Sequence, residues 1–464
     1  MTTITETNPY LLGNFAPVST EIQAENLKVI GEIPTELRGM FVRNGPNPQF
    51  SPIGQYHWFD GDGMLHGVHI ENGQATYRNR YIRTFGFERE QEAGKAIWSG
   101  LLEPPQLDNP YGPGKNTANT ALVWHSGKFL AVWEGGEPHQ IQLPSLNTVG
   151  TINFEGKLTS AFTAHPKVDP ITGEMLFFGY SLMQQPFLQY GIVSPEGELV
   201  KLIPIELPVG VMMHDFAITE HYTIFLDFPL TFRPERMAQG QPMFLFEAET
   251  PSRFGILPRH GESSDIRWFE SPSCYGFHTL NAYESGDEVI LIACRMESTN
   301  ALGIFEENAN SAGNIPYLYE WRFNLQTGAI QERSLGDLAC EFPRINEKYL
   351  GRKNRYGYVG KSKLGEMPLF DGLLKYDLET GKTEIHSFEP HCYGGEAVFV
   401  PHPQANSEDQ GWLLTFVYHE ASEQSELIVL DAQNFTQPAI ARIIMPQRVP
   451  YGFHGAWVSA EQFA

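Results

Sequence analysis

An all-β fold is the class that the sequence predicts. Helical periodicity is scarce, whereas short aromatic and β-branched runs recur along the chain, bounded by Gly, Pro, Asn or Asp. Turn signals such as Glu71-Asn-Gly and Pro195-Glu-Gly separate these runs, and the 44 glycines suit many tight turns. Many short strands joined by hairpins favour a closed architecture, and a β-propeller suits a chain of 464 residues.

The predicted strands are short, and several are apolar at almost every position, which is typical of strands buried on both faces. The clearest runs are Lys128–Glu134, Met175–Ser181, Tyr222–Phe228, Glu288–Cys294, Ala397–Pro401 and Trp412–Tyr418. An internal echo supports repeated hairpins, since Arg322-Phe-Asn-Leu-Gln-Thr-Gly matches Lys375-Tyr-Asp-Leu-Glu-Thr-Gly and a degenerate third copy ends at Asp431-Ala-Gln. Seven blades would average about 66 residues each.

No low-complexity linker divides the chain, so we expect a single domain over residues 1–464, with residues 1–30 as an N-terminal arm. The formal charge of -23 excludes a basic nucleic-acid footprint and would repel anionic lipid headgroups. The start of the chain has no signal-peptide pattern, and no apolar run reaches the length of a membrane span. The four cysteines form no CxxC pair, so we expect buried, reduced thiols and a cytoplasmic protein.

Four histidines lie beside small or aromatic residues in separate settings: His165, His214, His278 and His454. The gaps between them are 49, 64 and 176 residues, close to one, one and three blades. Histidines at equivalent places in different blades would all face the central axis. A metal held only by neutral imidazoles keeps its full charge and can leave sites open for a small ligand, which points to oxygen chemistry on an apolar substrate. Taken singly, each histidine would equally suit a hydrogen-bonded core position.

Glu134, Glu341 and Glu396 stand in apolar or turn contexts, where an unpaired carboxylate is strongly disfavoured. Metal-bound imidazoles normally pass their other N–H to a carboxylate or carbonyl. Three glutamates turned toward three of the four histidines would be satisfied and would offset the charge of a divalent cation. The alternative is that each glutamate caps a turn or pairs with one of the 32 basic residues.

Further segments occur in a fixed order from about Gly31 to Trp457. They are Arg43–Pro46, Phe59–Met64, Asn116–Thr120, Leu130–Gly136, His214–Thr219, His278–Glu284, Glu341–Pro343, Gly395–Pro401 and His454–Trp457. Together with the histidines and glutamates, they resemble the carotenoid cleavage oxygenases, non-haem iron enzymes that split conjugated double bonds with dioxygen. The resemblance covers nearly the whole chain.

The resemblance implies a seven-bladed β-propeller with a loop and helical cap over an axial Fe(II), one per chain. The iron ligands carry over to His165, His214, His278 and His454. The resemblance also implies that Glu134, Glu341 and Glu396 orient His214, His278 and His454, respectively, and that His165 lacks such a partner. Thr120 falls where the family places a threonine beside the open coordination site, although an ordinary turn residue is the alternative.

The implied reaction inserts both atoms of dioxygen across a C=C bond of a carotenoid or apocarotenoid, giving aldehyde or ketone products. An apolar tunnel would lead the polyene to the iron, with candidate lining from Phe228, Phe232, Phe246, Phe254, Phe277, Phe453 and Trp133, most of which would equally suit the blade core. The stretch 228–246 reads as an insertion. It would either contact a bilayer peripherally, drawing substrate out, or form a buried cap.

Three alternatives remain. Relatives that cleave stilbene-type phenols carry a lysine where this chain has Trp133, which favours a carotenoid or apocarotenal here. Relatives that isomerise retinyl esters are a poor match to a chain without a lipidation motif. A carotenoid-binding protein without activity would not need all four histidines and three glutamates.

Overall fold

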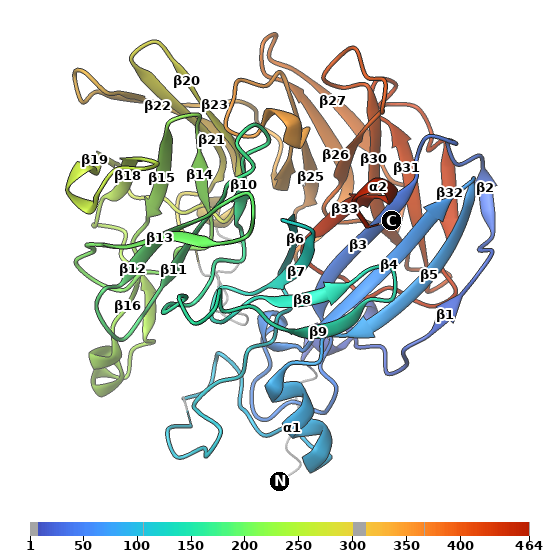
Figure 1. Ribbon diagram of the computed structural model, residues 1–464, viewed down its shortest axis with the longest axis horizontal. Coiled ribbons are helices and arrows are strands. Elements are labelled where there is room, and N and C mark those ends of the chain that lie inside the picture. The colour runs from blue at the N-terminus through green and yellow to red at the C-terminus, as the bar shows by residue number, and fades with distance from the viewer. Residues whose placement is uncertain (1–7, 105, 300–311, 366, 464) are drawn as a thin grey trace.

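Seven antiparallel sheets follow one another along the chain and surround a common axis in the computed structural model (Figure 1). The structure describes residues 8–104, 106–299, 312–365 and 367–463. The sheets are the blades of a β-propeller, so the predicted all-β, seven-bladed fold is confirmed. The first seven residues of the predicted N-terminal arm lie outside the described residues.

Blades 1 to 4 are built as follows. Blade 1 contains β1 (Gln23–Ala24), β5 (Gln74–Tyr81), β4 (Gly63–Glu71), β3 (Gly39–Pro46) and β33 (Gly455–Ser459). Blade 2 contains β6 (Ala121–His125), β7 (Lys128–Val132), β8 (His139–Gln142) and β9 (Asn147–Thr151). Blade 3 contains β10 (Lys167–Val168), β11 (Met175–Tyr180), β12 (Leu188–Val193) and β13 (Leu199–Ile205). Blade 4 contains β14 (Phe216–Ile218), β15 (Tyr222–Asp227), β18 (Ser252–Pro258) and β19 (Arg267–Ser271).

Blades 5 to 7 complete the ring. Blade 5 contains β20 (Thr279–Ser285), β21 (Glu288–Arg295), β22 (Tyr317–Asn324) and β23 (Ile330–Ser334). Blade 6 contains β24 (Cys340–Arg344), β25 (Tyr356–Lys363), β26 (Leu369–Asp377) and β27 (Lys382–Ser387). Blade 7 contains β28 (Cys392–Tyr393) and β29 (Val398–Pro401), both paired with β30 (Gly411–His419), then β31 (Gln424–Asp431), β32 (Ala441–Ile444) and β2 (Val29–Gly31).

Both ends of the chain close the ring. The C-terminal strand β33 pairs with β3 and becomes the inner strand of blade 1, while the N-terminal strand β2 pairs with β32 at the outer edge of blade 7. Figure 1 accordingly shows the blue and red sheets side by side. Two adjacent blades therefore each combine segments from opposite ends of the sequence.

Apolar packing lies between the blades. Seven clusters of buried side chains each join two neighbouring blades, and together they run once around the ring. Leu226 of blade 4 and Leu291 of blade 5, for example, belong to one such cluster. Because a blade packs on a neighbour at each face, its central strands need apolar side chains on both faces, which explains the continuous apolar runs. Each fully buried large side chain contributes about 1.5–3 kcal/mol.

Local turn chemistry agrees with the sequence. Asn72 and Gly73 have φ values of 51° and 75° and form the whole connection between β4 and β5. A two-residue hairpin turn with both central residues in the left-handed region is the type that matches the twist of the strands, and Asn-Gly is its preferred sequence. The echoed segments Arg322–Gly328 and Lys375–Gly381 both form the hairpin between the third and fourth strands of a blade.

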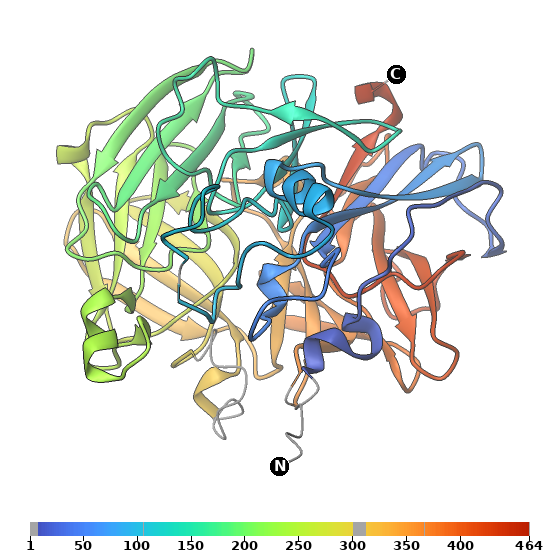
Figure 2. The same cartoon turned by 90° about the horizontal axis from the view of Figure 1, so that it is seen from below.

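The few helices lie outside the blades. They are α1 (Phe85–Ala93), α2 (Ala460–Phe463) and the 3-10 turns η1 (Pro9–Leu11), η2 (Gly13–Phe15), η3 (Trp58–Asp60), η4 (Pro234–Gln239), η5 (Ser263–Asp265), η6 (Ala312–Asn314) and η7 (Glu347–Tyr349). Figure 2 shows the dark blue N-terminal turns and the red α2 on opposite faces of the ring. Within the described part of the chain, no helix is long and apolar enough to cross a membrane.

Candidate metal centre

The four histidines occupy the same place in four blades. His165 and His214 lie two residues before the inner strands β10 and β14, and His278 and His454 lie immediately before β20 and β33. Since the inner strands surround the axis, residues at their starting ends face one another. This shared position explains how histidines as much as 289 residues apart in sequence can meet.

The other three blades also place a residue of interest near the start of the inner strand. Thr120 immediately precedes β6, Glu341 is the second residue of β24, and Glu396 lies two residues before β29. Glu134 is the exception, because it follows β7, the second strand of blade 2. The seven inner strands therefore supply one polar residue each to the same level of the axis.

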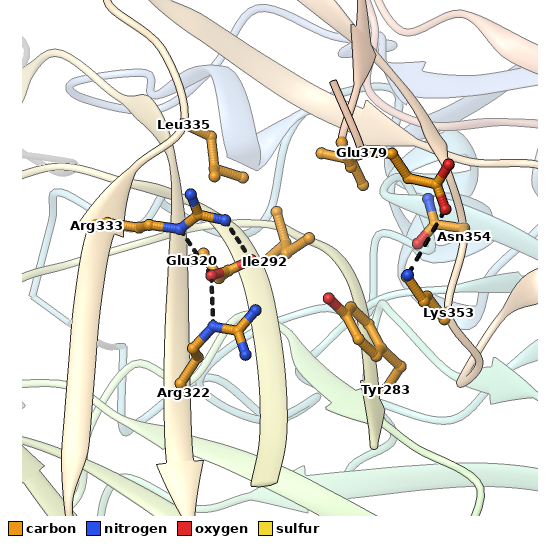
Figure 3. Close-up of a pocket in the computed structure, with 10 residues that line it drawn as sticks. Tyr283, Ile292, Glu320, Arg322, Arg333, Leu335, Lys353, Asn354 and Glu379 are labelled. Atoms are coloured by element: carbon orange, nitrogen blue, oxygen red, sulfur yellow. Dashed lines mark hydrogen bonds and ion pairs between the residues drawn. The ribbon is translucent and has the colours of Figure 1, made fainter. Parts of the chain in front are cut away.

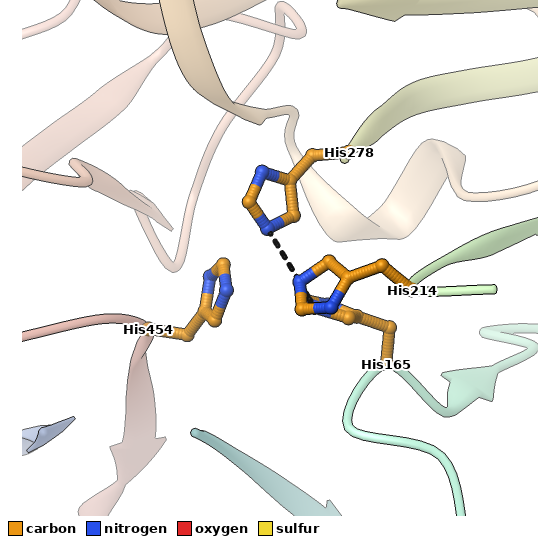
Figure 4. Close-up of side chains that lie close together, drawn as sticks. All are labelled: His165, His214, His278 and His454. Carbon is orange, nitrogen blue, oxygen red and sulfur yellow. Dashed lines mark hydrogen bonds between the residues drawn. The ribbon is translucent and has the colours of Figure 1, made fainter. Parts of the chain in front are cut away.

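The four imidazoles converge on one point, and Figure 4 shows their rings directed toward one another. The Nε2 atom of His214 lies 3.0 Å from Nε2 of His165 and 3.2 Å from Nε2 of His278. His454 completes the group, with its ring centre 4.5 Å from that of His165 and 4.8 Å from that of His278. One ligand atom from each histidine lies within 4.8 Å of all the others.

Three of the rings contact a carboxylate through Nδ1. The distances to the carboxylate oxygen are 2.8 Å for His214 and Glu134, 2.5 Å for His278 and Glu341, and 2.9 Å for His454 and Glu396. These are the pairs that the resemblance implies. Among the described residues, His165 has no carboxylate partner of this kind.

A neutral imidazole that donates its Nδ1 proton to a carboxylate has a lone pair on Nε2. Two such lone pairs face each other across the 3.2 Å between His214 and His278, an arrangement that a cation between them would stabilise. Two nitrogens bound at about 2.1 Å to one ion, at right angles, lie about 3.0 Å apart. The observed separations therefore fit a single metal ion held by nitrogen alone.

Burial keeps two of the imidazoles neutral. It lowers the pKa of His165 well below its ordinary value, and the neighbouring histidines lower it further. It lowers the pKa of His454 to about 4, although the Glu396 carboxylate acts in the opposite direction. For His278, burial also lowers the pKa, but the Glu341 carboxylate and the other nearby acids raise it more, so the net shift is upward.

The three glutamates differ in their own partners. Glu134 accepts a hydrogen bond of 2.8 Å from the Tyr180 hydroxyl. Glu396 accepts bonds from Arg344 (3.1 Å) and from the Gly455 amide (2.7 Å). Burial raises the pKa of Glu396, but Arg344 and His454 outweigh it and hold this pKa at about 2. Oε1 of Glu341 is buried without a hydrogen-bond partner.

Thr120 is buried, and its hydroxyl donates to Oδ1 of Asn119 at 2.9 Å. Its carbonyl accepts a bond of 3.2 Å from the His454 amide, so the backbone of Thr120 helps to place His454. Sequence reasoning missed three neighbours of the site: Tyr180, Arg344 and Phe342. The rings of His278 and His454 lie 5.3 and 5.2 Å from that of Phe342, whose φ of 56° is rare for a residue with a side chain.

We use the term channel end for the side of the histidines where the inner strands continue. A cavity of about 870 Å³ lies there, lined by three of the histidines and by residues of the inner strands of blades 1, 2, 3, 5, 6 and 7. Its wall mixes apolar side chains, such as Leu122, Trp124 and Val398, with charged ones: Arg344, Glu396 and the ion pair between Lys167 and Asp215, whose atoms lie 2.7 Å apart. None of the residues expected to line a substrate tunnel borders this cavity.

We use the term cap end for the opposite side, formed by residues that precede the histidines and the segments packed on them. Phe277 is half-buried, with its ring 5.4 Å from that of His214. Phe453 packs on Trp58 at 4.6 Å and on Phe59 at 5.6 Å. Phe277 therefore lies beside the histidine cluster on this side, and Phe453, next to His454 in sequence, belongs to an aromatic group with Trp58 and Phe59.

The remaining tunnel candidates have mixed positions. Phe254 is 0% exposed and its ring packs on Trp321 and Phe323 of blade 5, so it is a core residue and borders no space of the size of a water molecule. Phe228 is buried in the same cluster. Phe232 and Phe246 belong to a hairpin of β16 (Leu230–Phe232) and β17 (Phe244–Phe246) inserted into blade 4, and Trp133 is half-buried beside Glu134.

A second pocket, of about 330 Å³, lies between blades 5 and 6 (Figure 3). Arg322 and Arg333 both pair with the buried carboxylate of Glu320 on one side, and Lys353 and Glu379 lie on the other. The pocket borders none of the histidines of the axial cluster. The charged groups of this pocket are already paired with one another, so we interpret them as contacts that stabilise blades 5 and 6.

The fold and the histidine cluster define a β-propeller with a candidate metal site on its axis. The sequence pattern of the family described as "Retinal pigment epithelial membrane protein" matches residues 15–459. A carotenoid 9,10(9',10')-cleavage dioxygenase of Crocus sativus is 42% identical, over 98% of this chain and 89% of its own length. A carotenoid cleavage oxygenase of Mycobacterium tuberculosis is 36% identical, over 97% of each chain.

Solved structures agree with these relatives. Lignostilbene dioxygenase of Pseudomonas brassicacearum superposes with a TM-score of 0.90 at 30% identity, covering 98% of this chain and 99% of its own. Cobalt-substituted apocarotenoid oxygenase of Synechocystis has a TM-score of 0.85 at 30% identity, covering 96% and 97%. The chain belongs to the carotenoid cleavage oxygenase family.

Proposed function

We propose that the protein is an Fe(II)-dependent dioxygenase that cleaves a conjugated C=C bond of a carotenoid or apocarotenoid into two carbonyl products. The observation that carries this proposal is the group of four Nε2-directed imidazoles, three of them backed by carboxylates, in a chain 42% identical to a carotenoid-cleaving dioxygenase. One Fe(II) ion per chain follows from one four-histidine cluster among the described residues.

His165, His214, His278 and His454 would hold the iron, because imidazole nitrogen suits this metal and the geometry accommodates one ion. When bound, Fe(II) supplies open coordination positions at which dioxygen can react with a nearby substrate. Glu134, Glu341 and Glu396 keep the Nδ1 proton of their histidines in place and orient the rings. They also place negative charge around a group of neutral donors.

The chain's other contributions are positioning and exclusion of water. Phe277 places an aromatic ring 5.4 Å from that of His214 at the cap end, which offers an apolar surface to a polyene. We propose that Phe277 and Phe453 border the substrate path at the cap end. We also propose that Thr120, which is buried against the His454 segment, limits what binds beside the metal.

The substrate class rests on a further residue. Stilbene-cleaving relatives carry a lysine where this chain has Trp133, so a phenolate bound there would lack its cationic partner. A buried polar group without a partner costs about 1–3 kcal/mol. Relatives that are 40–43% identical over 98% of this chain are named for cleavage at the 9,10 (9',10') bonds. We propose that the same bonds of a carotenoid or apocarotenoid are cut here.

The test is to load the protein with Fe(II) and incubate it in detergent with a carotenoid, an apocarotenal and resveratrol under ¹⁸O₂. We expect aldehyde or ketone fragments of the polyenes with the masses of 9,10 cleavage, each carrying labelled oxygen. Fragments of other masses would overturn the assigned bond. Polyene products without label would overturn the dioxygenase reaction, and absence of any product with full iron occupancy would favour a carotenoid-binding protein.

A second candidate is a stilbenoid dioxygenase, favoured by the TM-score of 0.90 to the lignostilbene enzyme. The match to carotenoid-cleaving relatives has the higher identity, 42% against 30%. Preferred turnover of resveratrol in the same panel would establish the stilbenoid activity and leave the metal-site assignment intact.

We further propose that the cap end contacts a bilayer peripherally while substrate enters. Met237, in the η4 turn between β16 and β17, is 51% exposed, and Leu245, on β17 of the inserted hairpin, is 39% exposed. Co-sedimentation with neutral phosphatidylcholine vesicles tests this: binding by the parent that is reduced in the Met237→Ser, Leu245→Ser variant supports it. Equal sedimentation of the two proteins contradicts it.

A further inference from the structure

Blade 7 carries a second group of metal-ligand side chains outside the axial cluster. Glu389, Cys392 and His419, which we call the thiol–imidazole cluster, each offer one ligand atom within 4.8 Å of the others. Sγ of Cys392 lies 3.0 Å from Nδ1 of His419. No residue of this cluster belongs to the axial site.

The backbone holds these side chains in place. Cys392 and His419 lie directly opposite each other in the antiparallel pair β28–β30, so the distance between their side chains is fixed by the sheet. Glu389 belongs to the preceding turn, and its carbonyl accepts a 3.0 Å bond from the Cys392 amide. Cys392 is 4% exposed, whereas the Glu389 side chain is open to solvent. A small ion can therefore enter beside Glu389.

A buried carboxylate stands behind the imidazole. Oε1 of Glu426 lies 2.9 Å from Nε2 of His419, an electrostatic contact that is not aligned as a hydrogen bond. The Glu426 side chain is 5% exposed and is held by Arg442 at 2.9 Å. A carboxylate at one ring nitrogen favours the proton there, so the lone pair lies on Nδ1, toward Cys392.

The charges also favour a cation. Glu389 and Glu426 provide two negative charges and Arg442 one positive charge. Burial and these two carboxylates raise the pKa of the Cys392 thiol. On binding a divalent cation, the thiol loses its proton to solvent and the thiolate bonds to the metal, which balances the excess negative charge.

We propose that Glu389, Cys392 and His419 form a second metal site, for a borderline-soft divalent cation of the zinc class. Sulfur, nitrogen and oxygen from three side chains are a ligand set that zinc accepts, with a fourth position left for water. Glu426 is a positioning residue for His419. The axial cluster has no sulfur donor, so the two sites differ in chemistry and are separately testable.

The experiment is titration of the metal-free full-length protein with Co(II), followed by absorption spectroscopy. A cobalt–thiolate bond produces intense near-ultraviolet charge-transfer absorption, whereas cobalt bound to imidazoles alone gives only weak visible bands. We expect the charge-transfer absorption in the parent and in His278→Ala, and its loss in Cys392→Ser. Cys274→Ser is the matched control, because Cys274 is a buried cysteine in the core between blades 4 and 5 and should leave the absorption unchanged.

A second variant guards against misfolding of Cys392→Ser. Glu389 is exposed, so Glu389→Gln should leave the fold intact. It should weaken Zn(II) binding, measured by competition with a chromogenic chelator, by more than the roughly 10–100-fold that changes to outer-shell partners cost. Absence of the absorption in the parent, its persistence in Cys392→Ser, or unchanged zinc affinity in Glu389→Gln would each overturn the proposal.

Discussion

The two ends of the propeller axis differ in the side chains that they place beside the same four histidines. At the cap end, the ring of Phe277 lies beside that of His214, and Phe453, which directly precedes His454, packs on Trp58. At the channel end, the wall of the cavity carries Lys167, Asp215 and other charged groups. Apolar side chains such as Trp124 and Val398 stand among these charged groups.

This difference bears on which end of the axis a substrate would use to reach the histidines. A long polyene gains free energy by burying apolar surface, at about 25 cal/mol per Å². The wall of the channel end carries charged groups among its apolar side chains, whereas Phe277 places an aromatic ring beside a ligand ring at the cap end, so we infer that the substrate reaches the metal from the cap end. The 870 Å³ cavity touches three of the histidines, but on this inference it is not the route of the polyene.

The largest expected effect comes from removing one of the four histidines that lie between the two ends. His278→Ala deletes a ligand and leaves Glu341, already short of one hydrogen bond, without its imidazole partner. We expect loss of bound iron and of measurable activity while the fold persists, because packing between blades is untouched. Iron content by elemental analysis and circular dichroism measure the two properties.

His260→Ala is the matched control, because His260 is exposed and far from the axial group in the fold. It should retain both iron and activity. Full iron occupancy in His278→Ala would remove that residue from the ligand set.

The next effect concerns stability at the channel end. Asp169, which is 0% exposed, pairs with Arg259 at 2.6 Å and Arg352 at 2.7 Å and so ties blades 3, 4 and 6 together. Asp169→Asn leaves two guanidinium groups without their anion, and breaking a buried pair costs about 3–5 kcal/mol. Urea unfolding of the metal-free parent and variant at neutral pH measures the difference in free energy of unfolding.

The same pair predicts a pH dependence of defined sign. Burial raises the pKa of Asp169, but the two arginines and local amides outweigh it and lower this pKa from 3.8 to about 2. The folded-state pKa is below the unfolded value, so the stabilisation is complete above pH 3.8 and is lost as pH falls toward 2. The difference in free energy of unfolding between the parent and Asp169→Asn should become smaller as the pH falls through that range. A difference that stays constant would show that the Asp169 charge does not contribute to stability.

The sequence predicted the frame of the molecule well, for physical reasons. Strands between two blades need apolar side chains on both faces, so runs such as Met175–Ser181 stand out, and Asn72-Gly73 has the one geometry that a two-residue hairpin prefers. The positions of the four histidines followed from their motif settings, because each motif marks the start of an inner strand.

Other contacts across blades were not predictable. Tyr180 reaches Glu134 from blade 3 to blade 2, and Arg344 reaches Glu396 from blade 6 to blade 7, with no local signal for either. Cys392 and His419 are 27 residues apart and meet only through strand pairing. Phe254 shows a second limit of prediction from sequence. A phenylalanine in a strand looks the same in the sequence whether it lies in a core, as Phe254 does, or beside a tunnel.

A smaller effect should come from the carboxylates behind the histidines. Glu341→Gln keeps a hydrogen-bond acceptor for His278 but removes its charge, and changes of this kind cost about 10–100-fold in metal affinity or activity. Glu134→Gln should fall in the same range, because Tyr180 still has an oxygen to donate to. Activity measured against iron concentration checks both variants, and parental activity at limiting iron would contradict the assigned role.

The smallest expected effect tests the comparison of the two ends directly. Phe277→Leu keeps an apolar side chain at the cap end but removes an aromatic ring 5.4 Å from His214, and aromatic contacts contribute about 0.5–1.5 kcal/mol. We expect KM for a carotenoid to rise about 2–10-fold, with iron content unchanged. Lys348→Ala changes an exposed residue at the wall of the channel-end cavity and should leave KM as it is. If Lys348→Ala alters KM and Phe277→Leu does not, the polyene enters through the channel end, and the aromatic ring at the cap end does not select the route.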